Sequence, residues 1–304
     1  MTHLQQLADA ASATAFTLEA RDGFQLAACY YPTHTALQGN ILLAGATGVQ
    51  QKLYRRFAGF ANEHGFNVLT LDYRGIGGSR PKSLKGFEAN YLDWARLDLS
   101  AAVDLLADSG APPYWVGHSY GGQALGLIDN HDRIDAAYCF GTGAGWAGWM
   151  PPLEAIKVRL MWNVILPLIV ARKGYMAWSL LGMGDDLPLG IYQDWKRWCA
   201  NPHYFFDDPA MSEMHDIYAR VQTPSLFANA VDDAWAPPKS RDAFVPFYRN
   251  ANVATLDLTP SRSSIGHMGY FLANAEVMWA DCLTWLQTQA QARPANHQIA
   301  ESAS

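Results

Sequence analysis

The segment 116–121, which reads VGHSYG, most constrains how this chain can fold. It follows a short apolar stretch, 113–116, that is typical of a buried strand, and it precedes residues 122–129, whose Ala, Leu and Ile spacing is typical of a helix. A strand, a tight turn and a helix in this order force the central Ser119 into a strained backbone conformation, and the flanking glycines leave room for the strand and the helix to approach each other. The turn therefore predicts that the Ser119 hydroxyl faces outward as a candidate nucleophile.

A candidate base for Ser119 lies far downstream in the chain. A serine hydroxyl is a poor nucleophile unless a base accepts its proton, and the short G-x-S-x-G pattern also occurs by chance, so its partners decide whether the site is catalytic. His267 lies in the stretch 264–271, between the last apolar strand and the final helix, where a loop at the carboxyl edge of a sheet is expected. We predict His267 as the base, with a solvated turn residue as the alternative. His118, next to Ser119, should point away from the turn.

Two adjacent aspartates are candidates for the carboxylate that holds the base in one tautomer. Asp232 and Asp233 follow the apolar strand 226–231, and Pro237 after them is typical of a helix start. We favour Asp233 as the residue that orients His267, because it lies further past the strand end, and Asp232 remains the alternative. Either aspartate could instead only cap the following helix.

Acyl transfer also requires two N–H donors that stabilise the oxyanion formed when a carbonyl carbon is attacked. The backbone N–H of Tyr120 is the first candidate, because it lies at a helix start where the helix dipole strengthens the donor. The second donor is expected from the loop 45–48, which follows the apolar strand 41–44, and we prefer Thr47 to Gly48. A plain turn between strand and helix is the alternative interpretation of this loop.

Apolar runs alternate with amphipathic stretches along most of the chain, which predicts an α/β fold with a mostly parallel sheet and helices on both faces. The sheet is expected to begin with a hairpin that is closed by a two-residue turn at Asp22 and Gly23. The expected strands are 16–19, 25–31, 41–44, 66–71, 113–116, 134–140, 225–230 and 253–258. The expected helices are 54–64, 87–107, 122–129 and 275–289.

One segment, 142–221, breaks this alternation and holds six of the eleven tryptophans. Its helical, aromatic character predicts a cap inserted between two parts of a core, 1–141 and 222–291, and the polar stretch 292–304 predicts a disordered tail. Lys and Arg residues flank the apolar run 161–170 within the cap, as they would flank a membrane anchor. A bilayer span needs ~20 apolar residues, so we favour packing against the sheet or a pocket, and membrane contact is not expected.

Composition excludes several classes of protein. The 304 residues carry a formal net charge of -6 and no run of Lys or Arg, so no nucleic-acid partner is expected. The four cysteines are far apart and lack metal-ligand spacing, which predicts neither a metal site nor a disulfide framework. No cofactor is implied. The N-terminal stretch lacks the apolar core of a secretory signal, so a cytoplasmic location is expected, and the oligomeric state is left open.

Four motifs, GHSYG, DYRGIGGS, VDDAWAP and IGHMGYF, resemble the α/β-hydrolase superfamily over residues 16–291. Three further stretches, ATGVQQKLYRRFA, NVLTLDYRGIGGSRP and LPLGIYQDWKRWCANP, are similar to the bacterial predicted α/β hydrolases of the serine aminopeptidase-like branch. The resemblance implies an α/β-hydrolase fold. The family's triad and oxyanion positions fall here on Ser119, Asp233, His267, Tyr120 and Thr47. The His-Gly dipeptide that is common in the family's oxyanion loop is replaced here by Gly45 and Ala46, so Thr47 is the least constrained of these assignments.

These residues together predict a serine hydrolase that cleaves esters of small or medium apolar acyl groups through an acyl-enzyme intermediate. Amide or peptide hydrolysis and acyl transfer are alternatives on the same triad, and a non-catalytic protein that binds an apolar small molecule is an alternative from another class. Serine at position 119 argues against dehalogenase and epoxide hydrolase chemistry, which would require an aspartate there. The sequence leaves open whether Asp185 or Asp194 could hold the free amine of a peptide.

Overall fold

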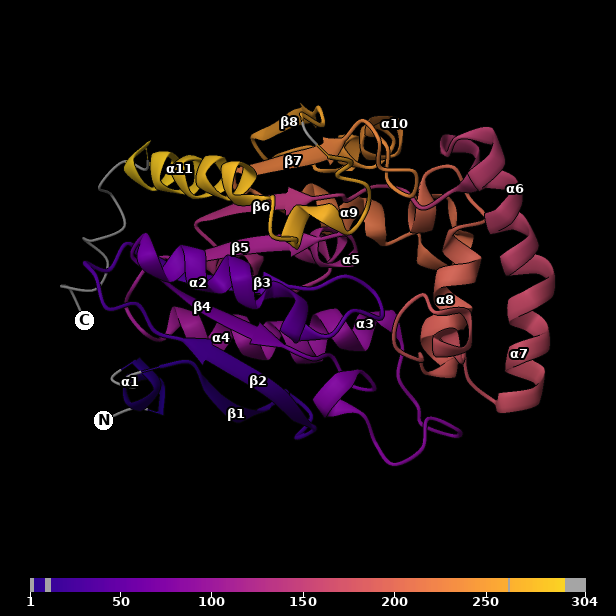
Figure 1. Ribbon diagram of the computed structural model, residues 1–304, viewed down its shortest axis with the longest axis horizontal. Coiled ribbons are helices and arrows are strands. Elements are labelled where there is room, and N and C mark those ends of the chain that lie inside the picture. The colour runs from indigo at the N-terminus through magenta and orange to yellow at the C-terminus, as the bar shows by residue number, and fades with distance from the viewer. Residues whose placement is uncertain (1–2, 9–11, 262, 293–304) are drawn as a thin grey trace.

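The computed structural model describes residues 3–8, 12–261 and 263–292, and its core is an eight-stranded sheet with the order β1-β2-β4-β3-β5-β6-β7-β8. The strands are β1 (Thr14–Glu19), β2 (Gln25–Tyr31), β3 (Gly39–Ala44), β4 (Phe66–Leu71), β5 (Pro113–His118), β6 (Ala136–Phe140), β7 (Ser225–Ala230) and β8 (Val253–Leu258). β2 pairs antiparallel with β1 and with β4, and all other strand pairs are parallel. The predicted mostly parallel sheet is confirmed (Figure 1).

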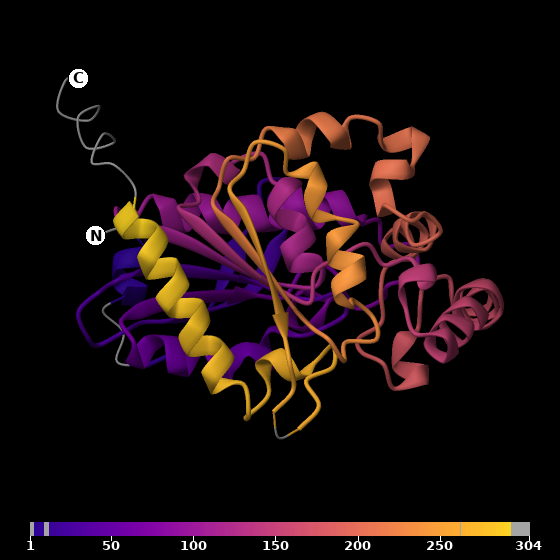
Figure 2. The same ribbon diagram turned by 90° about the horizontal axis from the view of Figure 1, so that it is seen from above.

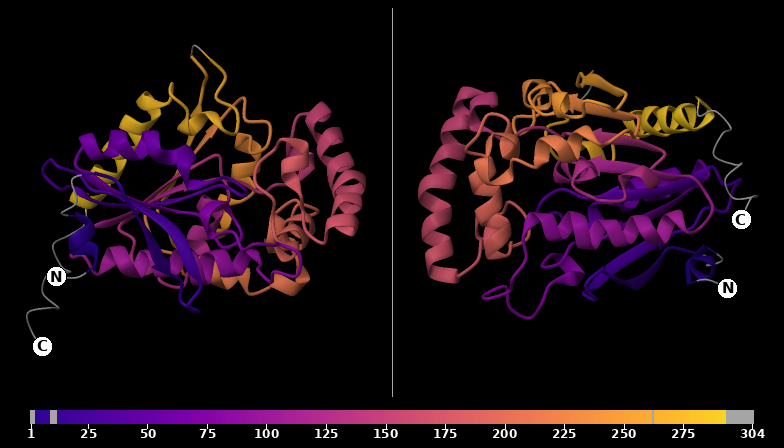
Figure 3. Two further views of the ribbon diagram at one scale, coloured as in Figure 1. Left: turned by 60° about the horizontal axis from the view of Figure 1, so that its bottom comes forward. Right: turned by 180° about the vertical axis from the view of Figure 1, so that it is seen from behind.

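Helices cover both faces of this sheet, which is why every residue of the inner strands β3, β4 and β7 is buried. The helices α2 (Arg55–Glu63) and α11 (Glu276–Ala292) lie on one face, and Figure 2 shows α11 running obliquely across the strands. The helix α4 (Ser100–Ala107) lies on the other face (Figure 3, left). Side chains alternate between the faces along β3: Ile41 packs into the same apolar cluster as α2 and α11, and Leu42 packs into the cluster that contains α4.

The remaining elements are short and lie mostly at the ends of the strands. Outside the 142–221 segment they are α1 (His3–Ala8), η1 (Gln51–Tyr54), η2 (Gly77–Ser79), α3 (Tyr91–Asp93), η3 (Trp94–Leu99), α5 (Tyr120–Gln123), η4 (Ala124–Gly126), η5 (His131–Arg133), α10 (Pro238–Asp242), η11 (Val245–Phe247) and η12 (Gly269–Phe271). In the 142–221 segment they are η6 (Ala147–Trp149), α6 (Pro152–Leu160), η7 (Met161–Ile165), α7 (Leu166–Lys173), η8 (Trp178–Leu181), α8 (Leu189–Trp198), η9 (Tyr204–Asp207), η10 (Pro209–Met211) and α9 (Met214–Ala219).

Two predicted helices are wrong at their ends. The helix expected over 87–107 begins four residues later, because Asn90 caps it: its side chain accepts from the Asp93 N–H at 3.1 Å, and its own N–H donates to the Asp93 carboxylate at 2.9 Å. The helix then continues through the π-helical turn η3 into α4. The helix expected over 122–129 begins two residues earlier as α5, directly after Ser119, and tightens into the 3₁₀ turn η4.

The predicted two-residue turn of the first hairpin is also wrong. Ala20 and Phe24 are joined by a backbone hydrogen bond of 2.8 Å, which leaves three residues, 21–23, in the turn. Gly23 supplies the positive φ of 85° that the turn needs, and the Asp22 carboxylate binds the Arg74 guanidinium at 2.7 Å. All other predicted strands and helices agree with the structure to within three residues at each end.

The 142–221 segment lies beyond the carboxyl ends of the parallel strands (Figure 1), with α6 and α7 outermost and α8 between them and the sheet (Figure 3, right). Its elements are helical, apart from one isolated β-bridge between Met176 and Leu187. None of the helices in the described ranges combines the length and the apolar character that crossing a bilayer requires. The predicted tail lies outside the described residues from residue 293 onward.

Candidate active site

Ser119 occupies the turn between β5 and α5 in a strained conformation, with φ 54° and ψ -113°. Non-glycine residues rarely adopt a positive φ, and such strain persists only where the surrounding structure holds it. Three backbone hydrogen bonds hold it here. The Ser119 N–H donates to the Phe140 carbonyl at 2.9 Å, and the Ser119 carbonyl accepts from the N–H groups of Gly122 at 3.0 Å and Gln123 at 3.3 Å. The predicted strained turn is therefore present, and Ser119 lies where β5 ends at the carboxyl edge of the sheet.

The glycines around Ser119 allow α5 to pack directly on the neighbouring strands. A Cβ atom on Gly121 would lie 1.9 Å from the Ala44 carbonyl oxygen of β3, and a Cβ on Gly117 would lie 2.6 Å from the Gly122 nitrogen. Both atoms that would be met belong to the backbone, so no side-chain rotation can relieve the clash. These two positions require glycine because the helix and the strands touch there.

We therefore expect Gly121→Ala to lower the free energy of unfolding by about 2–4 kcal/mol, measured by urea unfolding. Gly59→Ala on α2 is the matched control, because no atom lies within 4 Å of the added Cβ and φ there is not positive. Replacing this helical glycine should raise the unfolding free energy by up to about 1 kcal/mol. A Gly121→Ala protein as stable as the wild type would show that α5 can move away from β3 at little cost.

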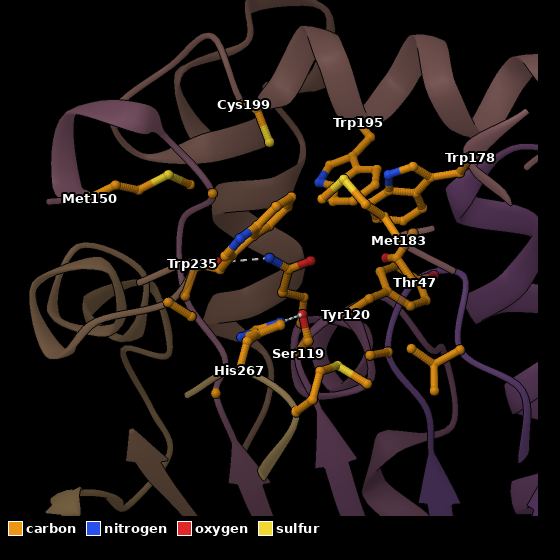
Figure 4. Close-up of a pocket in the computed structure, with 18 of the residues that line it drawn as sticks. Thr47, Ser119, Tyr120, Met150, Trp178, Met183, Trp195, Cys199, Trp235 and His267 are labelled. Atoms are coloured by element: carbon orange, nitrogen blue, oxygen red, sulfur yellow. Dashed lines mark hydrogen bonds between the residues drawn. The ribbon is translucent and has the colours of Figure 1, made fainter. Parts of the chain in front are cut away.

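The structure brings the three residues of the predicted triad together. His267, in the loop between β8 and α11, places Nε2 3.0 Å from the Ser119 Oγ (Figure 4). Its other ring nitrogen, Nδ1, lies 2.8 Å from Oδ2 of Asp233, in the loop after β7. When Nδ1 donates its proton to the carboxylate, Nε2 presents a lone pair to the serine hydroxyl, which is the tautomer that a general base needs.

Asp233 is buried and accepts hydrogen bonds on both carboxylate oxygens. Besides His267, the Tyr270 hydroxyl donates to Oδ2 at 2.9 Å, and the backbone N–H groups of Trp235 and Ala236 donate to Oδ1, each at 2.9 Å. Burial raises the pKa of this carboxyl, but the charge of His267 and the hydrogen bonds together lower it by more. The net result is a pKa below the ordinary value. Asp233 is therefore held as a carboxylate.

Asp232 has a different set of partners, and they belong to the loop that carries His267. Its carboxylate accepts from the Ser264 hydroxyl at 2.6 Å, from the Ile265 N–H at 3.0 Å and from the Gly266 N–H at 3.1 Å. The two aspartates thus act on the same loop in two ways: Asp233 contacts the imidazole ring and Asp232 contacts the backbone before it. The sequence predicted a role for only one of the two aspartates, the one that orients His267. No local pattern indicates that the other aspartate holds the loop.

His118 supports the same loop from the side away from the cavity. It is fully buried, its Nε2 lies 2.8 Å from the His267 carbonyl oxygen, and its Nδ1 lies 3.1 Å from the Tyr54 hydroxyl. Burial first, and then the charge of His267, lower the pKa of His118 to about 3, so the ring is neutral. A neutral ring can donate from Nε2 to the carbonyl and accept from Tyr54 at Nδ1. The sequence predicted that His118 turns away from the cavity, but not that it holds the His267 backbone.

Two backbone N–H groups near Ser119 are free to donate. Within the described part of the chain, the N–H groups of Thr47 and Tyr120 make no hydrogen bond to a protein acceptor. Their side chains are anchored by Tyr91, whose hydroxyl lies 2.6 Å from the Thr47 hydroxyl and whose carbonyl accepts from the Tyr120 hydroxyl at 2.5 Å. Thr47 lines the same cavity as Ser119, whereas Gly48 lines a neighbouring hollow.

A cavity of about 320 Å³ opens above Ser119, and its wall is mostly apolar. Figure 4 shows Ser119 and His267 at its floor and indole and thioether side chains above them. The large apolar side chains of the wall are Trp162, Trp178, Trp195, Trp235, Met150, Met183 and Met268. Three of the tryptophans come from the 142–221 segment, and Trp235, which sequence reasoning missed, follows Asp233 by two residues.

Only half of the tryptophans in the 142–221 segment line this cavity. Trp149 donates its indole N–H to the Pro202 carbonyl at 2.8 Å and stacks edge-on with Trp146 at 5.3 Å between ring centroids. Trp198 is buried against Tyr204 and Phe205. These three indoles are used in packing, so the tryptophans of the segment divide between the cavity wall and internal packing.

Comparison with known proteins identifies the family. The sequence profile of the alpha/beta hydrolase family matches residues 41–281, which is more than three quarters of the chain. The chain belongs to the alpha/beta hydrolase family. The predicted superfamily and fold are confirmed, while the aminopeptidase-like branch stays a prediction. No curated protein sequence matches this hydrolase.

Several solved structures share the fold of this alpha/beta hydrolase. Monoglyceride lipase from Saccharomyces cerevisiae superimposes with a TM-score of 0.66 at 18% identity, covering 91% of this chain and 96% of that chain. The esterase domain of a Rhodothermus marinus protein gives 0.56 at 17%, covering 91% and 98%. A puromycin hydrolase gives 0.60 at 16%, covering 93% of this chain and 40% of the other. At these identities the likeness shows a common fold.

None of the described residues that line the cavity of this hydrolase is Asp, Glu, Lys or Arg. Asp185 accepts from the Gln50 side chain at 2.8 Å and from the Gly77 N–H at 3.0 Å, and it lines the neighbouring hollow instead. Asp194 accepts from the Tyr91 N–H at 3.3 Å, outside the cavity wall. Neither aspartate is placed to hold a free amine beside Ser119.

Proposed function

We propose that this chain is a serine hydrolase that cleaves carboxylic esters of small or medium apolar acyl groups. The observation that carries the proposal is the hydrogen-bonded series Ser119, His267 and Asp233 at the floor of an apolar cavity. A hydroxyl 3.0 Å from an imidazole, whose other nitrogen meets a buried carboxylate, is the arrangement that activates serine as a nucleophile.

The proposed reaction has two steps. In the first, His267 takes the Ser119 proton through Nε2 while Oγ attacks the ester carbonyl carbon, and His267 then returns the proton to the departing alcohol. In the second, water attacks the acyl-enzyme with His267 again as the base, which releases the acid and restores Ser119. Throughout, Asp233 holds the ring and stabilises the imidazolium that forms.

The backbone N–H groups of Tyr120 and Thr47 are proposed to hold the oxyanion. Both lack a protein acceptor in the described structure, and donors that are free before the reaction need no rearrangement when negative charge develops. Tyr120 also begins α5, so the helix dipole favours an anion at its N–H. Thr47 is preferred to Gly48 because it lines the cavity above Ser119.

The segment 142–221 is proposed as a cap, with 1–141 and 222–291 forming the core. Its contribution to the cavity wall supports this division: Trp162, Trp178 and Trp195 face Ser119 from the segment, and the triad residues all belong to the core. The described residues of the wall include no Asp, Glu, Lys or Arg that could pair with a charged peptide terminus, so the wall favours an apolar acyl chain. The fold shared with a lipase and an esterase agrees with ester substrates.

A series of p-nitrophenyl esters from acetate to dodecanoate tests the proposal. Each buried methylene should contribute about 0.8 kcal/mol, which is nearly fourfold in kcat/KM, until the cavity is full. At ~30 Å³ for each non-hydrogen atom, the cavity holds about ten such atoms, so we expect the maximum at about six to eight acyl carbons. A value of kcat/KM that stays flat across the series would contradict an acyl pocket.

Two tryptophans of the cap serve as a matched pair in the same series. Trp195 lines the cavity and Trp146 does not, although both are half-buried. Trp195→Phe should shift the maximum to longer acyl chains, because it removes ring volume from the wall, whereas Trp146→Phe should leave the maximum in place. An equal shift in both variants would mean that the cap responds as a whole, without a defined acyl site.

A further inference from the structure

The outermost helix of the cap is apolar on two of its sides. It runs over α6, η7 and α7, from Pro152 to Lys173, along the edge of the molecule (Figure 1). One side packs inward, through the buried residues Ala155, Val158, Met161, Trp162 and Leu166. The other side carries an exposed stripe of Leu153, Ile156, Leu160, Val164 and Leu168. The exposed residues follow one another at steps of three or four, which places them along one side of the helix.

This stripe is unusual for the surface of the molecule. Of the fourteen large apolar side chains that the described residues expose, eight lie between 153 and 183, and the other six are distributed over the rest of the chain. Single exposed apolar residues need no explanation, whereas a contiguous patch marks an interaction site. The inward packing predicted for the apolar run therefore accounts for only one of the two apolar sides of this helix.

The net charge of this helix is opposite in sign to that of the whole chain. Between Pro152 and Lys173 there are four cations, Lys157, Arg159, Arg172 and Lys173, and one acid, Glu154, which pairs with Lys157 at 3.4 Å. The helix thus carries a formal charge of +3, while the chain carries -6. The cations lie near both ends of the exposed stripe. An apolar stripe with basic residues beside it has the chemistry of a helix that lies in the interface of an anionic membrane.

We propose that the helix 152–173 binds the surface of an anionic phospholipid bilayer, with the stripe Leu153, Ile156, Leu160, Val164 and Leu168 inserted among the acyl chains and the cations at the headgroups. The helix lies in the plane of the interface and does not span the bilayer. This surface is separate from the triad, and its proposed role does not depend on the catalytic assignment.

A second copy of the chain fits this surface less well than a lipid does. Lys157 and Arg159 lie toward one end of the helix, and Arg172 and Lys173 at the other. Two such helices packed stripe to stripe would bring cations against cations in the parallel and in the antiparallel orientation, and Glu154 alone offers an opposite charge. Like charges placed together disfavour an interface, whereas anionic headgroups favour the same cations.

Further exposed apolar side chains occur in the segment that follows the helix in the chain. Leu180, Leu181 and Met183 are exposed, and Met183 also lines the cavity above Ser119. A chain bound by this helix would be held at the lipid surface. If the proposed esterase activity holds, its substrates include amphiphiles drawn from that surface.

Sedimentation with phosphatidylcholine vesicles that contain phosphatidylglycerol tests the proposal. Wild-type protein and Ser119→Ala should both bind, and binding should weaken as salt is raised, because the headgroup attraction is screened. The double variant Leu160→Gln/Leu168→Gln should bind about tenfold or more weakly. Arg172→Gln/Lys173→Gln should also lose about tenfold or more. Val277→Gln on α11 is the control, because Val277 is 76% exposed, as is Leu153.

The proposal is overturned if the wild type stays in solution with anionic vesicles, or if Leu160→Gln/Leu168→Gln binds as the wild type does. It is also overturned if sedimentation equilibrium without lipid shows a dimer that this variant dissociates, because a second copy is then the occupant. Melting followed by circular dichroism and hydrolysis of a water-soluble ester should be unchanged in the variant, which separates lost lipid binding from misfolding. Failure of the catalytic proposal would instead appear as absent hydrolysis with vesicle binding intact.

Discussion

Ser119→Ala is expected to lower kcat for a p-nitrophenyl ester by about 10⁴-fold or more. The Ser119 hydroxyl lies 3.0 Å from the proposed base, so its removal leaves His267 without the nucleophile that it is proposed to activate. The remaining rate would come from the oxyanion donors and from substrate binding. A fluorophosphonate probe, which reacts with activated serines, should label the wild type and leave Ser119→Ala unlabelled.

The control removes a different hydroxyl from the same cavity. Thr47→Val keeps the backbone N–H that is proposed to hold the oxyanion and loses only the hydrogen bond to Tyr91, so we expect a loss in kcat below about tenfold. The melting temperature should show that Ser119→Ala is folded, because the Ser119 hydroxyl bonds only to His267 among the described residues. A Ser119→Ala protein that keeps more than about a tenth of the wild-type kcat would mean that another group is the nucleophile.

The parts of the site that could be predicted from the sequence are those whose geometry depends on neighbours in the chain. The turn at Ser119 needs glycines at fixed offsets, because α5 touches β3 there, and this requirement is visible as G-x-S-x-G. Loops after successive parallel strands meet at one edge of the sheet, which is why the positions of Asp233 and His267 in the chain order were enough to predict their meeting.

The parts that could not be predicted depend on contacts between residues distant in sequence. Asp232 holds a loop more than thirty residues away, and His118 holds the His267 carbonyl across 149 positions. No local pattern distinguishes these side chains from a helix cap or a core histidine. The same limit applies to the helix 152–173, where periodicity shows that the residues are apolar but not which of its two apolar sides remains exposed.

The division of the tryptophans of the 142–221 segment has the same cause. Six indoles in one segment favour a pocket, with internal packing as the alternative, but composition does not show which indole serves which role. In the structure, Trp198 is buried among Tyr91, Tyr204 and Phe205. Trp195 instead lines the cavity that contains Ser119, although the two tryptophans are three residues apart on α8. Which side of α8 meets the sheet decides this outcome, and that side is set by tertiary packing.

Asp233→Asn is expected to lower kcat by about 10³ to 10⁴-fold with little change in KM. An asparagine can turn its amide N–H toward Nδ1 of His267, which places the ring proton on Nε2, where it faces Ser119 and prevents proton acceptance. The backbone N–H groups of Trp235 and Ala236 already donate to Oδ1 at 2.9 Å, so they favour the asparagine oxygen on that side and the amide nitrogen toward the ring. Substrate binding in the apolar cavity does not involve this carboxylate, so KM should change little.

Asp232→Asn is the matched comparison, one residue away and with the same change of charge. Its carboxylate contacts Ser264, Ile265 and Gly266 and not the imidazole ring, so the tautomer of His267 should be preserved. We expect a loss in kcat of about tenfold or less, together with a lower melting temperature, because the two N–H groups that met a carboxylate now share one amide oxygen. Steady-state kinetics of both variants on one ester decide between the roles. If Asp232→Asn loses more kcat than Asp233→Asn, the orienting carboxylate is Asp232, and the 2.8 Å contact between Asp233 and His267 is then not the one that matters for proton transfer.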